Sequence, residues 1–136
     1  MLLSFALLTA ACGVEGRVSK SITATIAKGP GTRVVLTEHT PFAWDRVCVF
    51  GPYTPEDRVD ALTGIERASR QAHDIQRSEN LFVLMFIREG RIVASVALSR
   101  ADGDFARETA DKCYPPELSH FVVRVAAGGR PIISPE

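Results

Sequence analysis

The sequence predicts an α+β domain, with an antiparallel sheet of about five strands and one main helix packed on one face of it. Short apolar runs rich in β-branched residues recur along the chain, separated by turns that contain glycine or proline. One segment carries both the start and the stop signals of a helix. With 136 residues, the chain is long enough for a single domain with its own hydrophobic core.

The central strand is expected within Phe42–Tyr53. Val47–Phe50 is apolar without a break, which indicates a strand that is covered on both faces. Gly51 and Pro52 end it, because proline has no N–H for the ladder. The single tryptophan, Trp44, is expected to pack in the core with its N–H on a nearby acceptor.

Four residues around this strand also form the candidate binding surface of the sequence. Asp45 is expected to cap a turn or to accept the indole N–H, and the three others are Trp44, Pro52 and Tyr53. The competing interpretation is that these aromatic residues simply pack in the core, since buried aromatic side chains usually do.

Two short strands are expected before this segment. In Ser21–Ala27 the apolar residues alternate with threonines, which is the period of a half-buried strand. Arg33–Glu38 is expected as the second strand, after a turn rich in glycine and proline. Residues 12–20 are mostly polar and are expected to form a tether, so that the domain comprises residues 21–136.

The main helix is expected to start at Thr54. Thr54 is a suitable N-cap, Pro55 suits the first helical position, and two acidic residues follow where the helix dipole favours them. Apolar residues three apart predict a face that packs on the core. Gly64 is expected to end the helix, and a further helical turn could run through Ile65–Ala72.

The remaining strands follow this helix. Leu81–Ile87 and Ile92–Leu98 predict a hairpin whose turn, Arg88–Arg91, contains a glycine for the positive φ. The last strand is expected at Phe121–Ala126, and Pro131–Pro135 could add a short edge.

The N-terminal residues 1–11 predict a signal peptide. They form an apolar stretch that ends in small residues and is too short to span a bilayer as a helix, which takes about 20 residues. A signal peptide without lipidation and a buried N-terminal strand are the alternatives at this point.

The segment Leu8-Thr9-Ala10-Ala11-Cys12 resembles a bacterial lipobox, although Thr9 stands where leucine is usual and no Lys or Arg precedes the apolar run. The resemblance implies that Cys12 is lipidated and becomes the first residue. Gly13 after the cysteine implies the outer membrane of a Gram-negative cell, facing the periplasm, rather than the inner membrane. A secreted or periplasmic location is the alternative.

A second resemblance covers Thr40 to Gly64. Here Trp-Asp leads into a strand that ends in Pro-Tyr-Thr, and this is similar to a segment of small, uncharacterised bacterial envelope lipoproteins. The resemblance implies a location and a fold more than an activity.

If Cys12 carries lipid, Cys48 and Cys113 remain. An exported protein with two remaining cysteines favours a disulfide between them. No Cys-x-x-Cys motif indicates a redox-active pair, and His39, His73 and His120 lie too far apart in sequence for a zinc motif.

The composition favours no nucleic-acid partner, because 16 Lys and Arg balance 16 Asp and Glu. No metal or cofactor motif is present, and the acidic turn at Ala101–Asp104 lacks the ligand spacing of an EF-hand. The leading hypothesis is therefore a membrane-anchored envelope lipoprotein with a non-catalytic binding or structural domain and, with it, an envelope protein partner.

Two alternatives stay open. The first is a secreted or periplasmic protein inhibitor, whose contact would be the loop at Gly51–Tyr53 or at Tyr114–Pro116. The second is a small hydrolase, which would need a polar pocket that brings Asp45, His39 and His120 together.

Overall fold

The computed structural model describes residues 10–66 and 78–136. The fold is α+β, as the sequence predicts. Its described elements are, in order, α1 (Ala10–Ile26), β1 (Arg33–Val35), the 3-10 turn η1 (Leu36–Glu38), β2 (Arg46–Phe50), α2 (Glu56–Thr63), β3 (Leu81–Arg88), β4 (Arg91–Ser99), β5 (Asp104–Phe105), β6 (Lys112–Tyr114), η4 (Pro116–Leu118), β7 (His120–Val125) and β8 (Pro131–Pro135).

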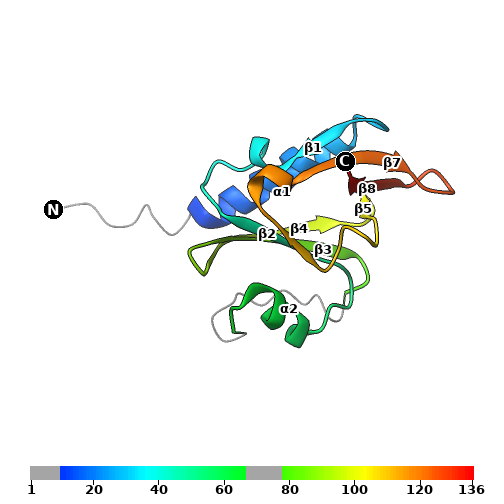
Figure 1. The fold of residues 1–136 in the computed structure, drawn as a ribbon. Helices are drawn as coiled ribbons and strands as arrows, with labels where there is room; N and C mark the ends of the chain where they lie inside the picture. Colours follow the sequence, from blue (N-terminus) through cyan, green and yellow to red (C-terminus); the bar gives the residue numbers. More distant parts are fainter. Residues whose placement is uncertain (1–9, 67–77) are drawn as a thin grey trace.

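The strands form two sheets of four, not one sheet of five. One sheet has the order β1-β7-β8-β5 and the other β4-β3-β2-β6. All pairs are antiparallel except β5 with β8. Figure 1 shows the two sheets as successive layers, with α2 below the second sheet. A second sheet arises because β1 pairs with β7, far along the chain, instead of extending the sheet of β2.

The main hydrophobic core lies between the two sheets and α1. It combines buried residues from α1, from both sheets and from the loop before β2. A smaller cluster lies on the other face of the second sheet, where α2 covers β2 and β6. The second sheet is therefore buried on both faces at β2 and β3, which accounts for their continuous apolar sequences.

The first helix overturns two expectations for the N-terminal region. Residues 12–20, expected as a tether, belong to α1, and so do residues 21–26 of Ser21–Ala27, which was expected as a strand. Val18, Ile22 and Ile26 are buried in the main core at spacings of four residues. Ile22 and Ile26 are four residues apart, which places them on one side of a strand and equally on one side of a helix. The alternation with threonine therefore does not distinguish a strand from a helix here.

The helix α1 also covers the outer edge of β4. The backbone N–H of Ser95 donates to Glu15 Oε1 at 2.9 Å, and the Ser19 hydroxyl donates to the carbonyl of Ala97 at 3.0 Å. These backbone groups of an edge strand would otherwise have no partner in the sheet. Side chains of α1 therefore protect the edge of β4 from pairing with another chain.

The central strand and its disulfide confirm the sequence prediction. Val47, Cys48, Val49 and Phe50 are fully buried in β2, between β3 and β6. Cys48 lies directly opposite Cys113 of β6, with the Cα atoms 4.0 Å apart, and the two form a disulfide. The disulfide therefore links the central strand to the short edge strand of its sheet.

The helix α2 ends at the predicted residue but does not begin with the predicted N-cap. Gly64 has a φ of 70° and its N–H donates to the carbonyl of Asp60, so it ends α2 in the left-handed conformation. Thr54 is not the N-cap, because its hydroxyl donates to the carbonyl of Gly51 at 2.6 Å and Pro55 precedes the helix. The further helical turn expected at Ile65–Ala72 does not begin at Ile65 or Glu66, which are not helical. The rest of that segment lies outside the described residues.

Arg46 closes the C-terminal end of α2. Its guanidinium donates to the carbonyl of Leu62 at 2.9 Å and to the carbonyl of Thr63. These carbonyls have no partner within the helix, and a cation at this end is favoured by the helix dipole. The start of β2 is thereby joined to the end of α2.

The hairpin of β3 and β4 has the two-residue turn Glu89-Gly90, with φ of 52° and 75°. Positive φ at both positions is the geometry that fits the twist of two paired strands. The strand β5 begins at Asp104, the last residue of the acidic turn expected at Ala101–Asp104. The strand Pro131–Pro135, expected at an edge, lies between β7 and β5.

Candidate functional site

The structure divides the predicted binding surface into two places. Trp44 and Asp45 precede β2, whereas Pro52 and Tyr53 follow it. The five residues of β2 between them span roughly 17 Å. The four residues therefore lie at opposite ends of one strand and make no common surface.

Trp44 is a core residue. Its side chain is 8% exposed, and its indole N–H donates to Thr40 Oγ1 at 2.9 Å. Its ring contacts Phe86 edge to face, with the ring centres 5.2 Å apart. The core interpretation of Trp44 thus agrees with its burial and its satisfied N–H.

Asp45 caps a turn, which is one of the two roles expected for it. Its Oδ2 accepts a hydrogen bond from the backbone N–H of Glu89 at 2.8 Å, in the turn between β3 and β4. The backbone N–H of Asp45 donates to the carbonyl of Ile87. Asp45 therefore fixes the hairpin against the start of β2.

Tyr53 is an exposed aromatic residue at the other end of β2, after the strand. It is 57% exposed, and its φ of 61° is unusual for a bulky side chain. Its N–H donates to the carbonyl of Ser78 at 3.2 Å, and its hydroxyl donates to Glu79 Oε2 at 3.0 Å. The hydrogen bond to Glu79 raises the pKa of Tyr53.

A polar network continues from Tyr53 across the same end. Arg100 donates to the carbonyl of Glu79 and to Asp104 Oδ2, both at 2.8 Å, and Arg130 lies 3.5 Å from the same carboxylate oxygen. These interactions connect the loop before β3 with the ends of β4 and the turn between β7 and β8. They present two guanidinium groups and one aromatic ring on one surface, which we call the Tyr53 end (Tyr53, Glu79, Arg100, Asp104 and Arg130).

A small polar cavity lies in the Tyr53 end. It has a volume of about 180 Å³ and is lined by Glu79, Asn80, Arg100, Ala101 and Arg130. Both signs of charge occur in it, and Asp104 already binds Arg100. Tyrosine and arginine are the residue types that contribute most to protein interfaces, so this surface suits contact with a protein better than capture of a free ion.

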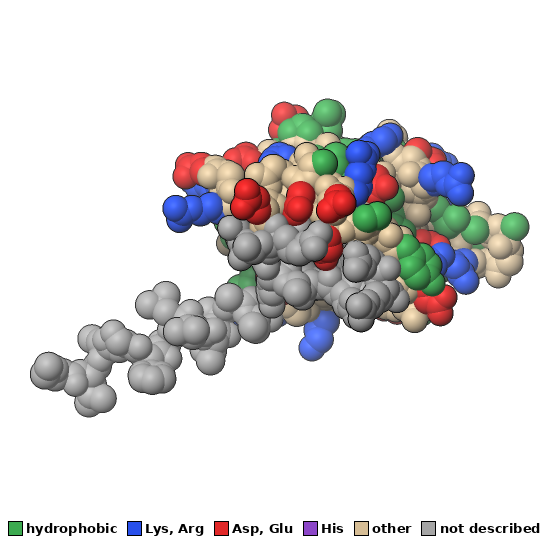
Figure 2. Space-filling model, turned by 90° about the horizontal axis from the view of Figure 1, so that it is seen from below, with side chains coloured by type: hydrophobic (Ala, Val, Ile, Leu, Met, Phe, Trp, Pro, Cys, Tyr) green, Lys and Arg blue, Asp and Glu red, His purple; other side chains and the backbone are tan. Residues whose placement is uncertain are grey.

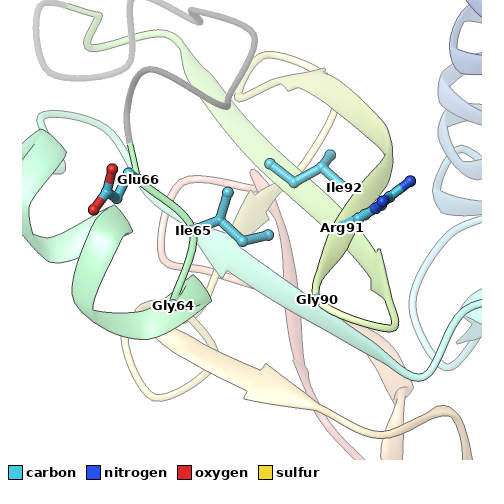
Figure 3. A pocket seen from close by; sticks show the side chains of 6 residues that line it. All are labelled: Gly64, Ile65, Glu66, Gly90, Arg91 and Ile92. Atoms are coloured by element: carbon cyan, nitrogen blue, oxygen red, sulfur yellow. The ribbon is translucent and has the colours of Figure 1, made fainter.

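An open groove lies at the other end, between α2 and the β3–β4 hairpin. Gly64, Ile65, Glu66, Gly90, Arg91 and Ile92 line it, and its volume is about 670 Å³. Figure 3 shows Ile65 and Ile92 pointing toward each other across the groove, whereas Arg91 extends away from it. The described lining offers an apolar contact, two glycines and two charged side chains, those of Glu66 and Arg91.

The residues that a hydrolase would need have separate partners. The Ser21 hydroxyl lies 2.7 Å from His39 Nδ1, His120 Nδ1 lies 3.3 Å from Arg33 Nη2, and Asp45 binds the hairpin turn. Burial lowers the pKa of His39. His73 lies outside the described residues. In 10–66 and 78–136, no three His, Cys, Asp or Glu side chains are grouped so as to hold a metal ion.

Comparisons with protein-family models, with curated proteins and with solved structures find no match to this chain. The interpretation of the Tyr53 end, and of the groove between α2 and the β3–β4 hairpin, therefore rests on their geometry.

The strained backbone of Tyr53 makes a testable prediction. We expect Tyr53→Gly to melt a few degrees higher than Tyr53→Ala, because only alanine retains a Cβ in the left-handed conformation. Both variants lose the ring and the hydrogen bond to Glu79, so each serves as the control of the other. Equal melting temperatures would show that φ at residue 53 relaxes without cost.

The sequence indicated Tyr53 but not the other residues of its end. Glu79, Arg100, Asp104 and Arg130 are scattered over fifty residues and share no spacing that a motif would have. They meet because β3 starts, β4 ends and β7 turns into β8 at the same end of the two sheets. Only the pairing of the strands brings them together.

Proposed function

We propose that this protein is an envelope lipoprotein, anchored through acyl chains on Cys12, whose domain binds a protein partner and has no catalytic role. The observation that supports this most directly is the position of the first core contact that the structure describes in α1. Val14 packs against the main core, followed by Val18, Ile22 and Ile26. Cleavage before Cys12 would leave all four of these residues in the mature domain.

The disulfide supports an exported location. Cys48 and Cys113 are paired, and structural disulfides persist in oxidising compartments such as the periplasm. Among the residues that the structure describes, no helix is both long and apolar enough to cross a bilayer. An anchor on Cys12 would attach the domain to a membrane by about 0.8 kcal/mol for each buried CH₂ group of its acyl chains.

The Tyr53 end supports a binding role. An exposed tyrosine in a strained turn and two arginines lie together on a surface whose backbone is held by hydrogen bonds. A rigid surface of this kind loses little conformational entropy when a partner binds. Figure 2 shows the face below α2, where acidic and basic side chains both occur outside the grey residues.

The test is the intact mass of the full chain isolated from the membranes of a Gram-negative host. We expect a chain that starts at Cys12, carries a lipid-sized increment, and has no free thiol until it is reduced. The Cys12→Ser variant should keep residues 1–11, because lipobox processing requires the cysteine. The same cleavage in both chains, without added mass, would contradict the anchor and indicate a signal peptide without lipidation.

A secreted or periplasmic inhibitor is the second candidate, favoured by the exposure of Tyr53. Of the two contact loops considered for it, Tyr114–Pro116 is less suited, because the Tyr114 ring packs on Phe121 and its hydroxyl donates to the carbonyl of Thr109. An inhibitor would bind one enzyme tightly from solution and lose that binding in Tyr53→Ala. It would show the mass of an unlipidated chain in the experiment above.

A further inference from the structure

The direction of α1 relative to β4 defines which end of the domain a lipid on Cys12 would hold at a membrane. Glu15 is bound to Ser95, and Ser19, one helical turn later, is bound to Ala97. Helix and strand therefore run in the same direction. Figure 1 agrees, because the start of α1 and the β3–β4 turn lie on the same side of the molecule.

The β3–β4 turn extends beyond Cys12 along this direction. Cys12 lies three residues before Glu15 in α1, which is about 4.5 Å along a helix. Arg91 lies four residues before Ser95 in β4, which is about 13 Å along a strand. The turn thus reaches roughly 9 Å further than Cys12, somewhat more than the roughly 5–8 Å thickness of one headgroup layer of a bilayer.

We propose that the β3–β4 hairpin end is a membrane-contact surface that rests in the phospholipid headgroups when Cys12 is lipidated. This inference rests on the proposed lipid anchor. Because Glu15 is held by β4 one turn after Cys12, no flexible segment separates the lipidated residue from the domain. While the first turn of α1 stays folded, an anchor on Cys12 therefore holds the hairpin turn close to the headgroups.

The side chains of this end suit an interface between water and lipid. Val93 is 44% exposed, and Arg88 and Arg91 are exposed on either side of the turn. Arginine side chains place their apolar stems along lipid and their guanidinium groups on phosphate. Glu89 and Asp45 lie here too, so net charge contributes little, and the acyl chains supply the attachment while the hairpin sets the orientation.

The same orientation directs the Tyr53 end away from the membrane. Tyr53 follows the opposite end of β2, and Arg130 lies in the turn between β7 and β8. Figure 1 shows that turn on the side opposite to the start of α1. A partner in the periplasm or in the medium would therefore reach Tyr53 without contacting lipid.

The test compares two exposed valines at opposite ends. Val93→Trp places a reporter beside the hairpin, and Val125→Trp places one at the end of β7, where Val125 is 53% exposed. The full lipidated chains are reconstituted into phosphatidylcholine vesicles that contain a lipid with a nitroxide on its headgroup. Wild-type protein provides the background of Trp44, which also lies toward the hairpin end.

After subtraction of the wild-type signal, we expect nitroxide quenching several-fold stronger at position 93 than at position 125. Equal quenching in chains that float with the vesicles would overturn the orientation and leave the anchor in place. Chains that do not float would overturn the anchor and, with it, the orientation. If Val93→Trp does not fold, Arg91→Trp reports on the same end with the same two outcomes.

Discussion

Replacing both Cys48 and Cys113 with alanine is expected to lower the free energy of unfolding by up to about 4 kcal/mol. The disulfide closes a loop with a sequence separation of 65 residues, and loss of that constraint raises the entropy of the unfolded chain. Denaturant unfolding followed by circular dichroism measures the change. Alanine is the suitable replacement, because Cys48 is fully buried and a serine hydroxyl there would lack a partner.

Reduced wild-type protein is the control for this double variant. It should unfold at nearly the same denaturant concentration as the variant, because both lack the constraint. A difference of less than about 1 kcal/mol between oxidised and reduced wild type would show that β6 stays paired with β2 by its backbone alone. We also expect faster hydrogen exchange in β6 than in β2 after reduction, since β6 is the short edge strand.

Ile22→Ala is expected to cost about 2–5 kcal/mol of stability. Ile22 is fully buried in α1, in a core that it shares with both sheets. Removal of its side chain leaves a cavity that the two sheets can fill only in part. Thermal and denaturant unfolding of the full chain measure the loss.

Lys20→Ala is the matched control on the same helix. Lys20 is exposed in α1, so its replacement should change stability by less than about 0.5 kcal/mol. Similar small effects of Ile22→Ala and Lys20→Ala would mean that α1 is not part of the folded core. That result would restore the tether that the sequence suggested.

Features that depend only on neighbouring residues could be predicted from the sequence. Continuous apolar runs marked β2 and β3, Glu89-Gly90 set the hairpin turn, and Gly64 ended α2. Each of these follows from local conformation or from burial on both faces, so a few adjacent residues suffice. The pairing of Cys48 with Cys113 could also be predicted, since these are the two cysteines left if the chain is exported and Cys12 carries lipid.

The remaining features depend on contacts between segments that lie far apart in the chain. Residues 21–26 are helical because Ile22 and Ile26 face both sheets from one side of α1, and alternation alone could not distinguish this from a strand. The two-residue strand β5 and the three-residue strand β6 form because partner strands lie beside them, not because of their own sequences. The residues of the Tyr53 end meet for the same reason, since non-local strand pairing, and no local pattern, places them at one end of the domain.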